Sequence, residues 1–280
     1  MHGIGNDFVV LDARARPLAI DADAARAIAD RRTGVGCDQL IVVEPSEVAD
    51  VFMRIRNSDG GEVEACGNGA RCVASLVLAE AGREEITIET LAGVLPARRV
   101  AADRYEVAMG VPRFEWQEIP LAKEMDTLNL DLSIGPASRP VLSDPVALSI
   151  GNPHAVFFVD DVATVDIATV GPMLEHHPLF PERANIGFAQ ILGPDRLRLR
   201  VWERGAGLTQ ACGSGACAAA VAAARRDYTG REVTLVLDGG ELGIRWREAD
   251  GEILMTGPVA TAFTGELSAD LVDSLAEAAA

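Results

Sequence analysis

The sequence predicts an α+β fold made of two pseudo-symmetric lobes, and a repeated cysteine motif is the main reason. Residues 65–72 read ACGNGARC, and residues 211–218 read ACGSGACA. Each motif leads into an apolar run of helical length, and short runs of β-branched residues typical of strands lie before and after it. A chain in which the same pattern of a helix and strands occurs twice is expected to fold as two similar units.

The spacing between the two motifs extends through the rest of each half. Cys66 and Cys212 are 146 residues apart (212 minus 66), and this offset aligns similar residues from residue 4 to residue 112 without a gap. The matched pairs are Asn6 and Asn152, Gln39 and Asn185, Asn57 and Glu203, Gly93 and Gly239, Met109 and Met255, and Pro112 and Pro258. This register predicts a duplicated unit.

Strands and helices can be placed in order along each half, with two helices in each. The apolar runs that favour strands are residues 7–11, 39–43, 51–55, 155–159, 197–202 and 233–237. An amphipathic run at 21–32 favours a helix. A second helix begins after each cysteine motif and is expected to end at Gly82 in one copy and at Arg225 and Arg226 in the other. Because these helices are so apolar, each is expected to be buried inside a mixed, largely antiparallel sheet.

These elements predict the organisation of the chain. The expected parts are an N-terminal lobe at 1–112, a linker leading into the second lobe at 113–146, a C-terminal lobe at 147–258, and a final strand and tail at 259–280 that packs back on the first lobe. Beyond residue 266 we expect a short surface helix without a functional signal.

Composition excludes several classes of function. The 280 residues carry a net charge of −17, so the basic footprint of a nucleic-acid-binding protein is missing. No apolar run approaches the ~18 residues of a membrane span, and the N-terminus does not resemble a signal peptide, so a cytoplasmic protein is expected. The five cysteines are an odd number without CxxC spacing, which argues against a disulfide framework and against a metal site.

A cysteine just before a helix has defined chemistry. The helix N-terminus presents N–H groups without intrahelical acceptors and a positive dipole end, which favour a thiolate and bind anions. The glycines beside each cysteine, Gly67 and Gly69 in one copy and Gly213 and Gly215 in the other, let a carboxylate approach the backbone closely. Each motif therefore predicts a thiol next to a carboxylate site.

Two such motifs together predict proton transfer on both faces of one carbon. Opposed thiols in one cleft, one ionised and one protonated, can remove a proton from one face of a carbon and deliver one to the other face. Most amino-acid racemases instead use pyridoxal phosphate, which needs a Schiff-base lysine. The chain has a single lysine, Lys123, in a loop-like segment. We therefore expect a cofactor-free inversion without metal.

At these motifs the sequence resembles the diaminopimelate epimerase family. The similar segments are MHGIGNDFVVLD, GVGCDQL, NSDGGEVEACGNGARC, GNPHAVFFVDD, FPERANIGF, ERGAGLTQACGSGACA and MTGP, over residues 1–260. The resemblance implies conversion of LL-diaminopimelate to the meso form, for lysine and peptidoglycan, without cofactor. It also implies two similar lobes, each a barrel-like sheet around a central helix, and a homodimer.

The resemblance implies a role for each matching residue. Cys66 and Cys212 would be the acid/base pair, and His154 and Glu203 would tune the two thiols. The reacting carboxylate would bind backbone N–H groups of Gly67, Asn68, Gly213 and Ser214. The remaining substrate-binding positions would be Asn6, Gln39, Asn57, Asn152, Asn185, Glu203 and Arg204, with the Arg204 guanidinium on the distal carboxylate.

The residues alone also allow other roles for these side chains and other functions for the protein. Cys37, Cys72 and Cys217 are expected to be buried core residues. His154 could be purely structural, Arg204 could bridge to an acidic neighbour, and Cys66 and Cys212 could form a disulfide in an oxidised, inactive state. Competing functions are a proline racemase or hydroxyproline epimerase, which shares the two-thiol scheme, and a thiol redox or binding protein.

Overall fold

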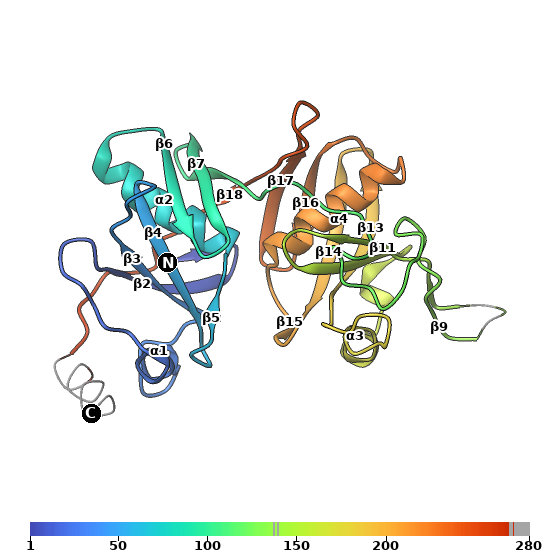
Figure 1. The fold of residues 1–280 in the computed structure, drawn as a ribbon, viewed down its shortest axis with the longest axis horizontal. Helices are drawn as coiled ribbons and strands as arrows, with labels where there is room; N and C mark the ends of the chain where they lie inside the picture. The colour runs from blue at the N-terminus through green and yellow to red at the C-terminus, as the bar shows by residue number, and fades with distance from the viewer. Residues whose placement is uncertain (137, 139, 269–270, 272–280) are drawn as a thin grey trace. The chain divides into compact units, whose positions relative to one another are not determined.

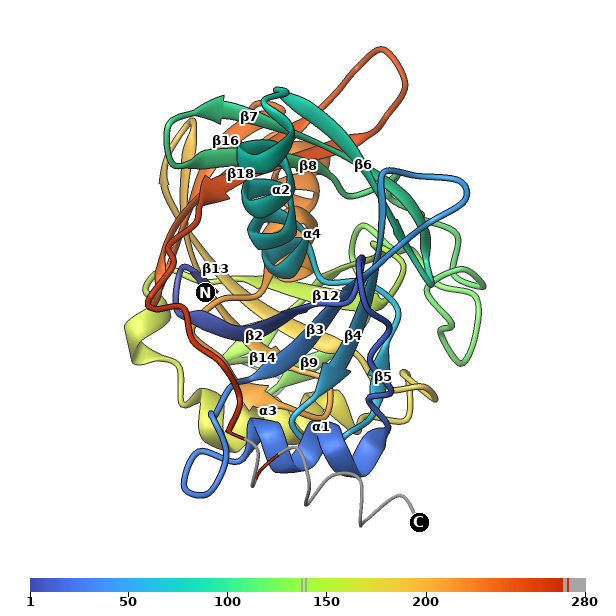
Figure 2. The same ribbon diagram turned by 90° about the vertical axis from the view of Figure 1, so that its left-hand side faces the viewer.

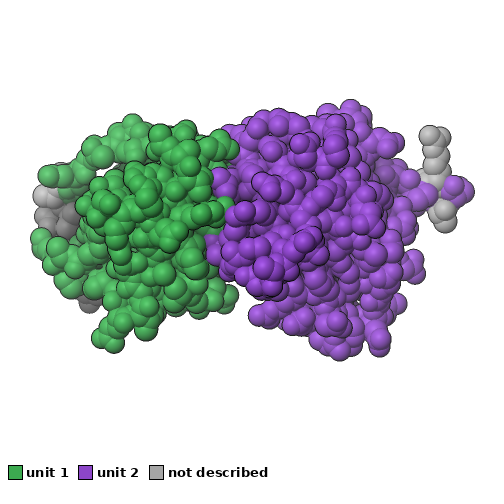
Figure 3. Space-filling view, turned by 90° about the horizontal axis from the view of Figure 1, so that it is seen from above, with its two compact units in different colours: residues 1–107, 257–280 green, residues 108–256 purple. Residues whose placement is uncertain are grey.

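The protein divides into two compact units in the computed structural model, which describes residues 1–136, 138, 140–268 and 271 (Figure 1). Unit 1 comprises Met1–Val107 and Gly257–Ala280, and unit 2 comprises Ala108–Thr256 (Figure 3). Residues 113–146, expected as a linker, belong to unit 2. The helix expected beyond residue 266 falls largely outside the described residues. No helix in the described ranges is long and apolar enough to cross a membrane.

In its described residues, unit 1 is a mixed sheet with the helices α1 (Ala22–Ala29) and α2 (Gly67–Ala81). The strands lie in the order β1 (His2–Gly3), β2 (Asn6–Asp12), β3 (Gln39–Glu44), β4 (Val51–Asn57), β6 (Glu85–Thr90), β7 (Gly93–Ala101) and β8 (Arg104–Ala108), with β5 (Glu62–Val63) on β4. The pairs β2–β3 and β4–β6 are parallel, and the other pairs are antiparallel.

Unit 2 repeats this plan. The strands lie in the order β11 (Val146–Ser149), β12 (Pro153–Phe158), β13 (Asn185–Gly193), β14 (Arg196–Glu203), β16 (Glu232–Leu237), β17 (Gly240–Trp246) and β18 (Ile253–Pro258), with β15 (Gly207–Leu208) on β14 and the helices η1 (Val162–Thr164), α3 (Ile167–Glu175) and α4 (Gly213–Arg225). A separate hairpin, β9 (Ser133–Ile134) and β10 (Leu142–Ser143), precedes β11. Leu130, Leu132 and Leu142 belong to the core of this unit.

Each sheet is closed by a short segment that bonds to both of its end strands. In unit 1, Val259 donates its backbone N–H to Asp103 beside β8, and Ala260 pairs with His2 of β1. In unit 2, Met109 donates to Ile253 of β18, and residue 113 pairs with residue 149 of β11. The predicted fold class is therefore confirmed: each unit is a barrel-like mixed sheet.

The central helices begin at the cysteine motifs, as predicted. α2 packs against β1, β2, β6 and β7, and Figure 2 shows it beside the strands of unit 1. It ends at Gly82, whose φ of 62° is left-handed and whose N–H donates to the Leu78 carbonyl oxygen at 3.1 Å. α4 packs against β11–β14, β16 and β17 and ends at Arg225, with Arg226 as its C-cap.

The predicted gap-free register is wrong beyond the central helices. In the β6–β7 hairpin Gly93 pairs with Thr90, and in the β16–β17 hairpin Gly240, not Gly239, pairs with Leu237. The offset has thus become 147, because the stretch from the start of the central helix to the next strand is one residue longer in unit 2: α4 is two residues shorter than α2, but the loop after it is three residues longer.

The offset grows by one more residue at the last strand of each unit. Val107 lies opposite Ala97, whereas Met255 lies opposite Ile244. Met255 is therefore the counterpart of Val107 and not of Met109. The pairs Met109–Met255 and Pro112–Pro258 are similar in sequence but not equivalent in the fold.

Candidate active site

Cys66 and Cys212 occupy the same place in the two units. Each is the N-cap of its central helix with an extended backbone, φ −144° at Cys66 and −121° at Cys212. The Sγ of Cys66 accepts the Gly69 N–H at 3.4 Å, and the Sγ of Cys212 accepts the Gly215 N–H at 3.4 Å. A sulfur that accepts a backbone N–H at a helix N-terminus is favoured as a thiolate.

Glycine at the third helical position allows the close packing of each helix start. A Cβ on Gly69 would lie 2.7 Å from Cδ1 of Ile41, and one on Gly215 would lie 2.8 Å from Cγ2 of Val201. Without these side chains each helix start can lie directly on the sheet. The N–H groups of the first turn have no intrahelical acceptor, so they can bind an anion beside each thiol.

In unit 1, Asn6 turns its carbonyl oxygen toward Cys66. Its Oδ1 lies 4.0 Å from Cys66 Sγ and accepts Asn68 Nδ2 at 3.2 Å. Its Nδ2 donates to Oδ2 of Asp38 at 3.1 Å. Because a carboxylate only accepts, Asp38 fixes the amide with its nitrogen away from the thiol. The structure thus brings together the predicted residues Asn6, Cys66 and Asn68.

Asp38 is a supporting residue that the sequence analysis did not identify. Arg31 donates to Asp38 Oδ1 at 2.8 Å and to both oxygens of Asp7 at 2.7 and 2.8 Å. The hydrogen bonds from Arg31 lower the pKa of the Asp7 carboxyl against the opposing effect of partial burial. Asp38 lies in the quoted segment GVGCDQL, but nothing local to that segment pointed to Asn6, 32 positions away.

Two further predicted pairs lie at equivalent positions on neighbouring strands. Gln39 donates Nε2 to Asn57 Oδ1 at 2.9 Å, and its buried Oε1 accepts no hydrogen bond from any described residue. In unit 2 their counterparts are Asn185 and Glu203. Asn185 donates to the Pro153 carbonyl oxygen at 3.1 Å and accepts a backbone N–H at 3.0 Å, so its amide supports the main chain.

A chain of polar side chains leads to Cys212 in unit 2. His154 Nε2 lies 2.8 Å from Asn152 Oδ1, and since an amide oxygen only accepts, Nε2 carries the proton. Asn152 then donates Nδ2 to Ser214 Oγ at 3.5 Å, and Ser214 Oγ lies 3.7 Å from Cys212 Sγ. Four predicted residues thus form one hydrogen-bonded chain.

His154 is neutral at physiological pH. The side chain is 1% exposed, and burial, with a smaller effect of the Arg204 charge, lowers the pKa of the imidazole to about 3. Its hydrogen bond goes to Asn152 and not to Cys212. Within unit 2, the hydrogen bond of His154 therefore orients the Asn152 amide.

The Cys212 thiol is held in its protonated form. It is 4% exposed, and burial raises its pKa well above the usual value. The neighbouring Glu203 carboxylate raises the pKa further, against smaller lowering effects of the hydrogen bonds with Gly215 and Ser214. Glu203 also accepts a hydrogen bond from the Thr209 hydroxyl, a contact that the sequence did not indicate. Because its counterpart Asn57 is neutral, the two half-sites differ in charge.

Arg204 lies in an exposed turn. Its backbone N–H is the one that Asn185 accepts, and its Nη1 donates to the carbonyl oxygen of Glu182 at 3.2 Å. Across the described ranges no carboxylate lies within 4.0 Å of the guanidinium. The predicted alternative of an acidic bridge is therefore not seen, and among the described residues the guanidinium donates to one acceptor, the Glu182 carbonyl oxygen.

The other cysteines are buried core residues, as predicted. Cys37 is 2% exposed, and Cys72 and Cys217 are fully buried. Burial raises the pKa of Cys72 to about 12, so this thiol is unreactive. All five cysteines are described, and none forms a disulfide. In the described part of the chain, no group of three or more His, Cys, Asp or Glu side chains could hold a metal ion.

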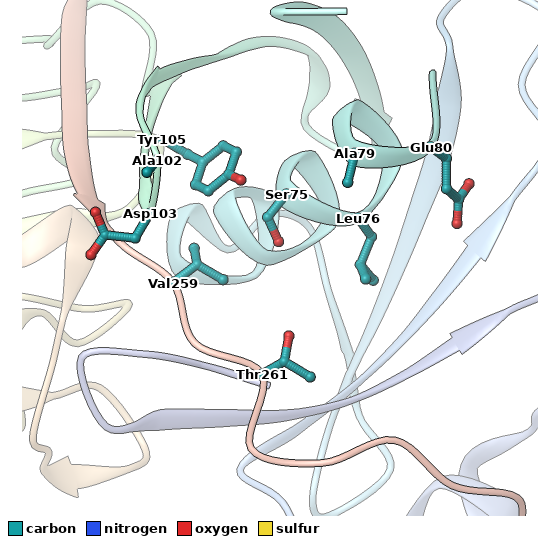
Figure 4. Close-up of a pocket in the computed structure, with 9 residues that line it drawn as sticks. All are labelled: Ser75, Leu76, Ala79, Glu80, Ala102, Asp103, Tyr105, Val259 and Thr261. Atoms are coloured by element: carbon teal, nitrogen blue, oxygen red, sulfur yellow. The ribbon is translucent and has the colours of Figure 1, made fainter. Parts of the chain in front are cut away.

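Unit 1 also has a pocket of about 380 Å³ (Figure 4). Figure 4 shows that Ser75 and Glu80 of α2 line it together with Tyr105 and Thr261. None of the predicted site residues lines this pocket, which is therefore separate from the thiol site.

Comparisons with known proteins match this arrangement. The family model described as diaminopimelate epimerase matches residues 1–115 and 146–262. The diaminopimelate epimerase of Rhodospirillum centenum is 59% identical over 274 residues, 97% of this chain and 92% of that protein. That of Acidiphilium cryptum is 57% identical over 272 residues, 97% of this chain and 96% of that protein.

A solved structure supports the fold alone. The PhzF-family phenazine biosynthesis protein of Bacillus anthracis matches with a TM-score of 0.62 and 20% identity over 92% of each chain. The family itself follows from the sequence matches, which span both units and both cysteine motifs. On these grounds the chain belongs to the diaminopimelate epimerase family.

Proposed function

We propose that this chain converts LL-diaminopimelate to meso-diaminopimelate by proton transfer at one α-carbon, with the thiols of Cys66 and Cys212 as base and acid. The observation that carries the proposal is the repeated N-cap geometry: each thiol lies at the start of a buried helix. Membership of the family supports the same reaction, which makes the chain an isomerase.

The backbone supplies the electrostatic part of the mechanism. Removal of the α-proton develops charge on the adjoining carboxylate. The N–H groups of Gly67, Asn68, Gly213 and Ser214 are the donors that would hold this carboxylate. A preorganised donor at a developing oxyanion contributes about 2.7–4 kcal/mol. These donors therefore supply more of the rate enhancement than the about 0.3–1 kcal/mol by which a helix dipole stabilises a thiolate.

The thiols supply the proton transfer. In one direction the Cys66 thiolate takes the α-proton, so that the C–H bond breaks and an S–H bond forms. The carbanion then takes a proton from Cys212, which is left as the thiolate, and the reverse reaction exchanges these roles. Burial beside Glu203 favours the protonated form of Cys212, which supports Cys212 as the proton donor in this direction.

The distal end of the substrate determines specificity. Arg204 is exposed and has no carboxylate partner among the described residues, so its planar guanidinium can donate two parallel hydrogen bonds to a distal carboxylate. Neutral amides of Asn6, Gln39, Asn57 and Asn152 supply further hydrogen bonds, and Asn185 supports the backbone of Arg204. Proline and hydroxyproline have no second carboxylate, which disfavours the alternative function.

The experiment that tests the substrate is a comparison of amino acids with the reduced protein. LL-diaminopimelate, L-proline and trans-4-hydroxy-L-proline are each incubated without pyridoxal phosphate or metal, and stereoisomers are separated chromatographically. We expect the meso isomer from LL-diaminopimelate and no inversion of the two imino acids. Inversion of proline without meso-diaminopimelate formation would overturn the assignment.

We also propose that the protein is a cytoplasmic homodimer acting in lysine and peptidoglycan precursor synthesis. The family resemblance supports this proposal. Light scattering coupled to size-exclusion chromatography tests the dimer directly: a mass near the 29.6 kDa of one chain over a wide concentration range would refute it.

A further inference from the structure

The turn between β14 and β15 carries Glu203 and Arg204. Glu203 pairs with Gly207, and its carbonyl oxygen accepts the Ala206 N–H at 3.1 Å. Gly205 and Gly207 have φ of 76° and 80°. Two glycines in left-handed conformations make the turn possible but also easy to deform. The positions of Glu203 and Arg204 therefore depend on contacts from outside the turn.

The carboxylate of Glu175 supplies such contacts on both sides of the pair. Its Oε2 accepts the indole N–H of Trp202 at 2.7 Å. Its Oε1 accepts the backbone N–H of Gly205 at 3.0 Å. Trp202 immediately precedes Glu203–Arg204 and Gly205 immediately follows them. One carboxylate thus fixes both ends of the two-residue segment.

Glu175 stands where general rules disfavour a carboxylate. It is the last residue of α3, at the negative end of the helix dipole, and it is 4% exposed. Burial acts to raise its pKa, but the hydrogen bonds from Trp202 and Gly205, with nearby His176 and Arg183, outweigh this and lower it. A buried anion at an unfavourable helix end is the kind of local conflict expected at functional positions.

The helix is fitted to hold Trp202 as well. A Cβ on Gly171 would lie 2.5 Å from Cδ2 of Trp202, so the indole ring lies directly against α3 at this glycine. Gly171 and Glu175 are four residues apart and share one face of the helix. α3 therefore contacts the indole ring through Gly171 and the indole N–H through Glu175. These two contacts make α3 a rigid support for the turn.

We propose that Glu175 is a positioning residue that holds Glu203 beside Cys212 and sets the backbone from which Arg204 reaches the substrate. The proposal rests on the proposed function for the roles of Glu203 and Arg204. Arg183 adds a longer contact, with its Nη1 3.7 Å from Glu175 Oε1, and Glu182 accepts a hydrogen bond from Arg204. The segment after α3 thus supports the same turn.

The test uses Glu175→Gln in the full chain. Glutamine keeps the size, but its amide nitrogen cannot accept, so one of the two hydrogen bonds becomes a contact between donors. Glu80→Gln is the matched control, since Glu80 lies near the end of α2 and pairs with Arg14 at 2.7 Å, outside the proposed site. For Glu175→Gln we expect kcat/KM with LL-diaminopimelate to fall about 10- to 100-fold, as for a misplaced catalytic group. Glu80→Gln should retain the wild-type value.

Two readouts separate positioning from general stabilisation. The first is the pH midpoint of Cys212 alkylation by iodoacetamide, measured by mass spectrometry without substrate. In Glu175→Gln, displacement of the Glu203 carboxylate should lower this pH midpoint. Glu203→Gln removes the same carboxylate charge and should lower the midpoint as well. The second is a double-mutant cycle: if Glu175 acts through Glu203, the loss in the double variant should be smaller than the product of the two single losses.

The outcomes are distinguishable. An unchanged alkylation midpoint together with independent losses in the cycle would overturn the proposal. If Glu175→Gln does not fold, Trp202→Phe removes the indole donor while leaving the carboxylate, and it should shift the midpoint in the same direction. A folded Trp202→Phe without that shift would then overturn it. Absence of meso product from the wild type would refute the proposed function instead, because the alkylation readout needs no substrate.

Discussion

Replacing Gly215 by alanine should disable the thiol of Cys212 without removing it. The new Cβ would lie 2.8 Å from Cγ2 of Val201 and 3.1 Å from Sγ of Cys212. Carbon atoms pack best at about 3.5–4.0 Å, so the overlap with Val201 is about 0.7–1.2 Å. Val201 is 2% exposed and β-branched, and its side chain has little freedom to rotate away. The start of α4 and the sulfur must therefore move.

The expected cost is moderate for stability and large for activity. Overpacking of this kind costs about 1–3 kcal/mol, and alanine in place of glycine in a helix returns about 1 kcal/mol, which leaves a net loss of about 0–2 kcal/mol. The melting temperature should fall by at most about 8 °C at about 2–4 °C per kcal/mol. Displacement of the sulfur should lower kcat/KM about 10- to 100-fold.

The assay is epimerisation of LL-diaminopimelate, with thermal unfolding followed by circular dichroism. Gly230→Ala is the matched control in the same unit, because nothing lies within 4 Å of a Cβ at Gly230 and its φ is not left-handed. The control should keep wild-type activity and melting temperature. Wild-type kcat/KM in Gly215→Ala would refute the reasoning that the helix start and the thiol are held in close contact.

Three further predictions follow from the same geometry. Below about pH 9, Cys66 should be alkylated faster than Cys212, because burial and Glu203 raise the pKa of Cys212; peptide mass spectrometry that finds Cys212 faster would contradict this. Asp38→Ala should lower kcat/KM about 10-fold by releasing the Asn6 amide, whereas exposed Asp131→Ala should not, as steady-state kinetics will show. Arg204→Lys should raise KM about 10-fold or more, because an ammonium cannot replace a bidentate guanidinium; an unchanged KM would remove Arg204 from the substrate site.

The cysteine motifs and central helices were predictable because their signals are local. A helix start is written in a few adjacent residues, and the glycines around Cys66 and Cys212 indicated both the cap and the anion site. The end of α2 at Gly82 was predictable for the same reason, since only glycine readily adopts the left-handed φ found there. The fold class was predictable because these local signals occur twice in the sequence.

The supporting contacts were not predictable because they join distant segments. Glu175 contacts Trp202 across 27 positions and Asp38 contacts Asn6 across 32, and neither contact leaves a local pattern. The drift in the repeat register has a similar cause. A net difference of one residue between the helix start and the next strand changes no hydrophobic periodicity, so the coincidence of Gly93 with Gly239 suggested a register that the strand pairing does not have. Tertiary packing decided each of these features.

The most direct test of the account is isotopic. The reduced protein is incubated with LL-diaminopimelate in D2O without pyridoxal phosphate or metal, and stereoisomers and α-deuterium are followed together. We predict meso-diaminopimelate with solvent deuterium at the inverted carbon, and loss of meso formation in both Cys66→Ala and Cys212→Ala. Meso product without deuterium, or full epimerisation by either folded variant, would contradict a mechanism with one thiol on each face of the carbon.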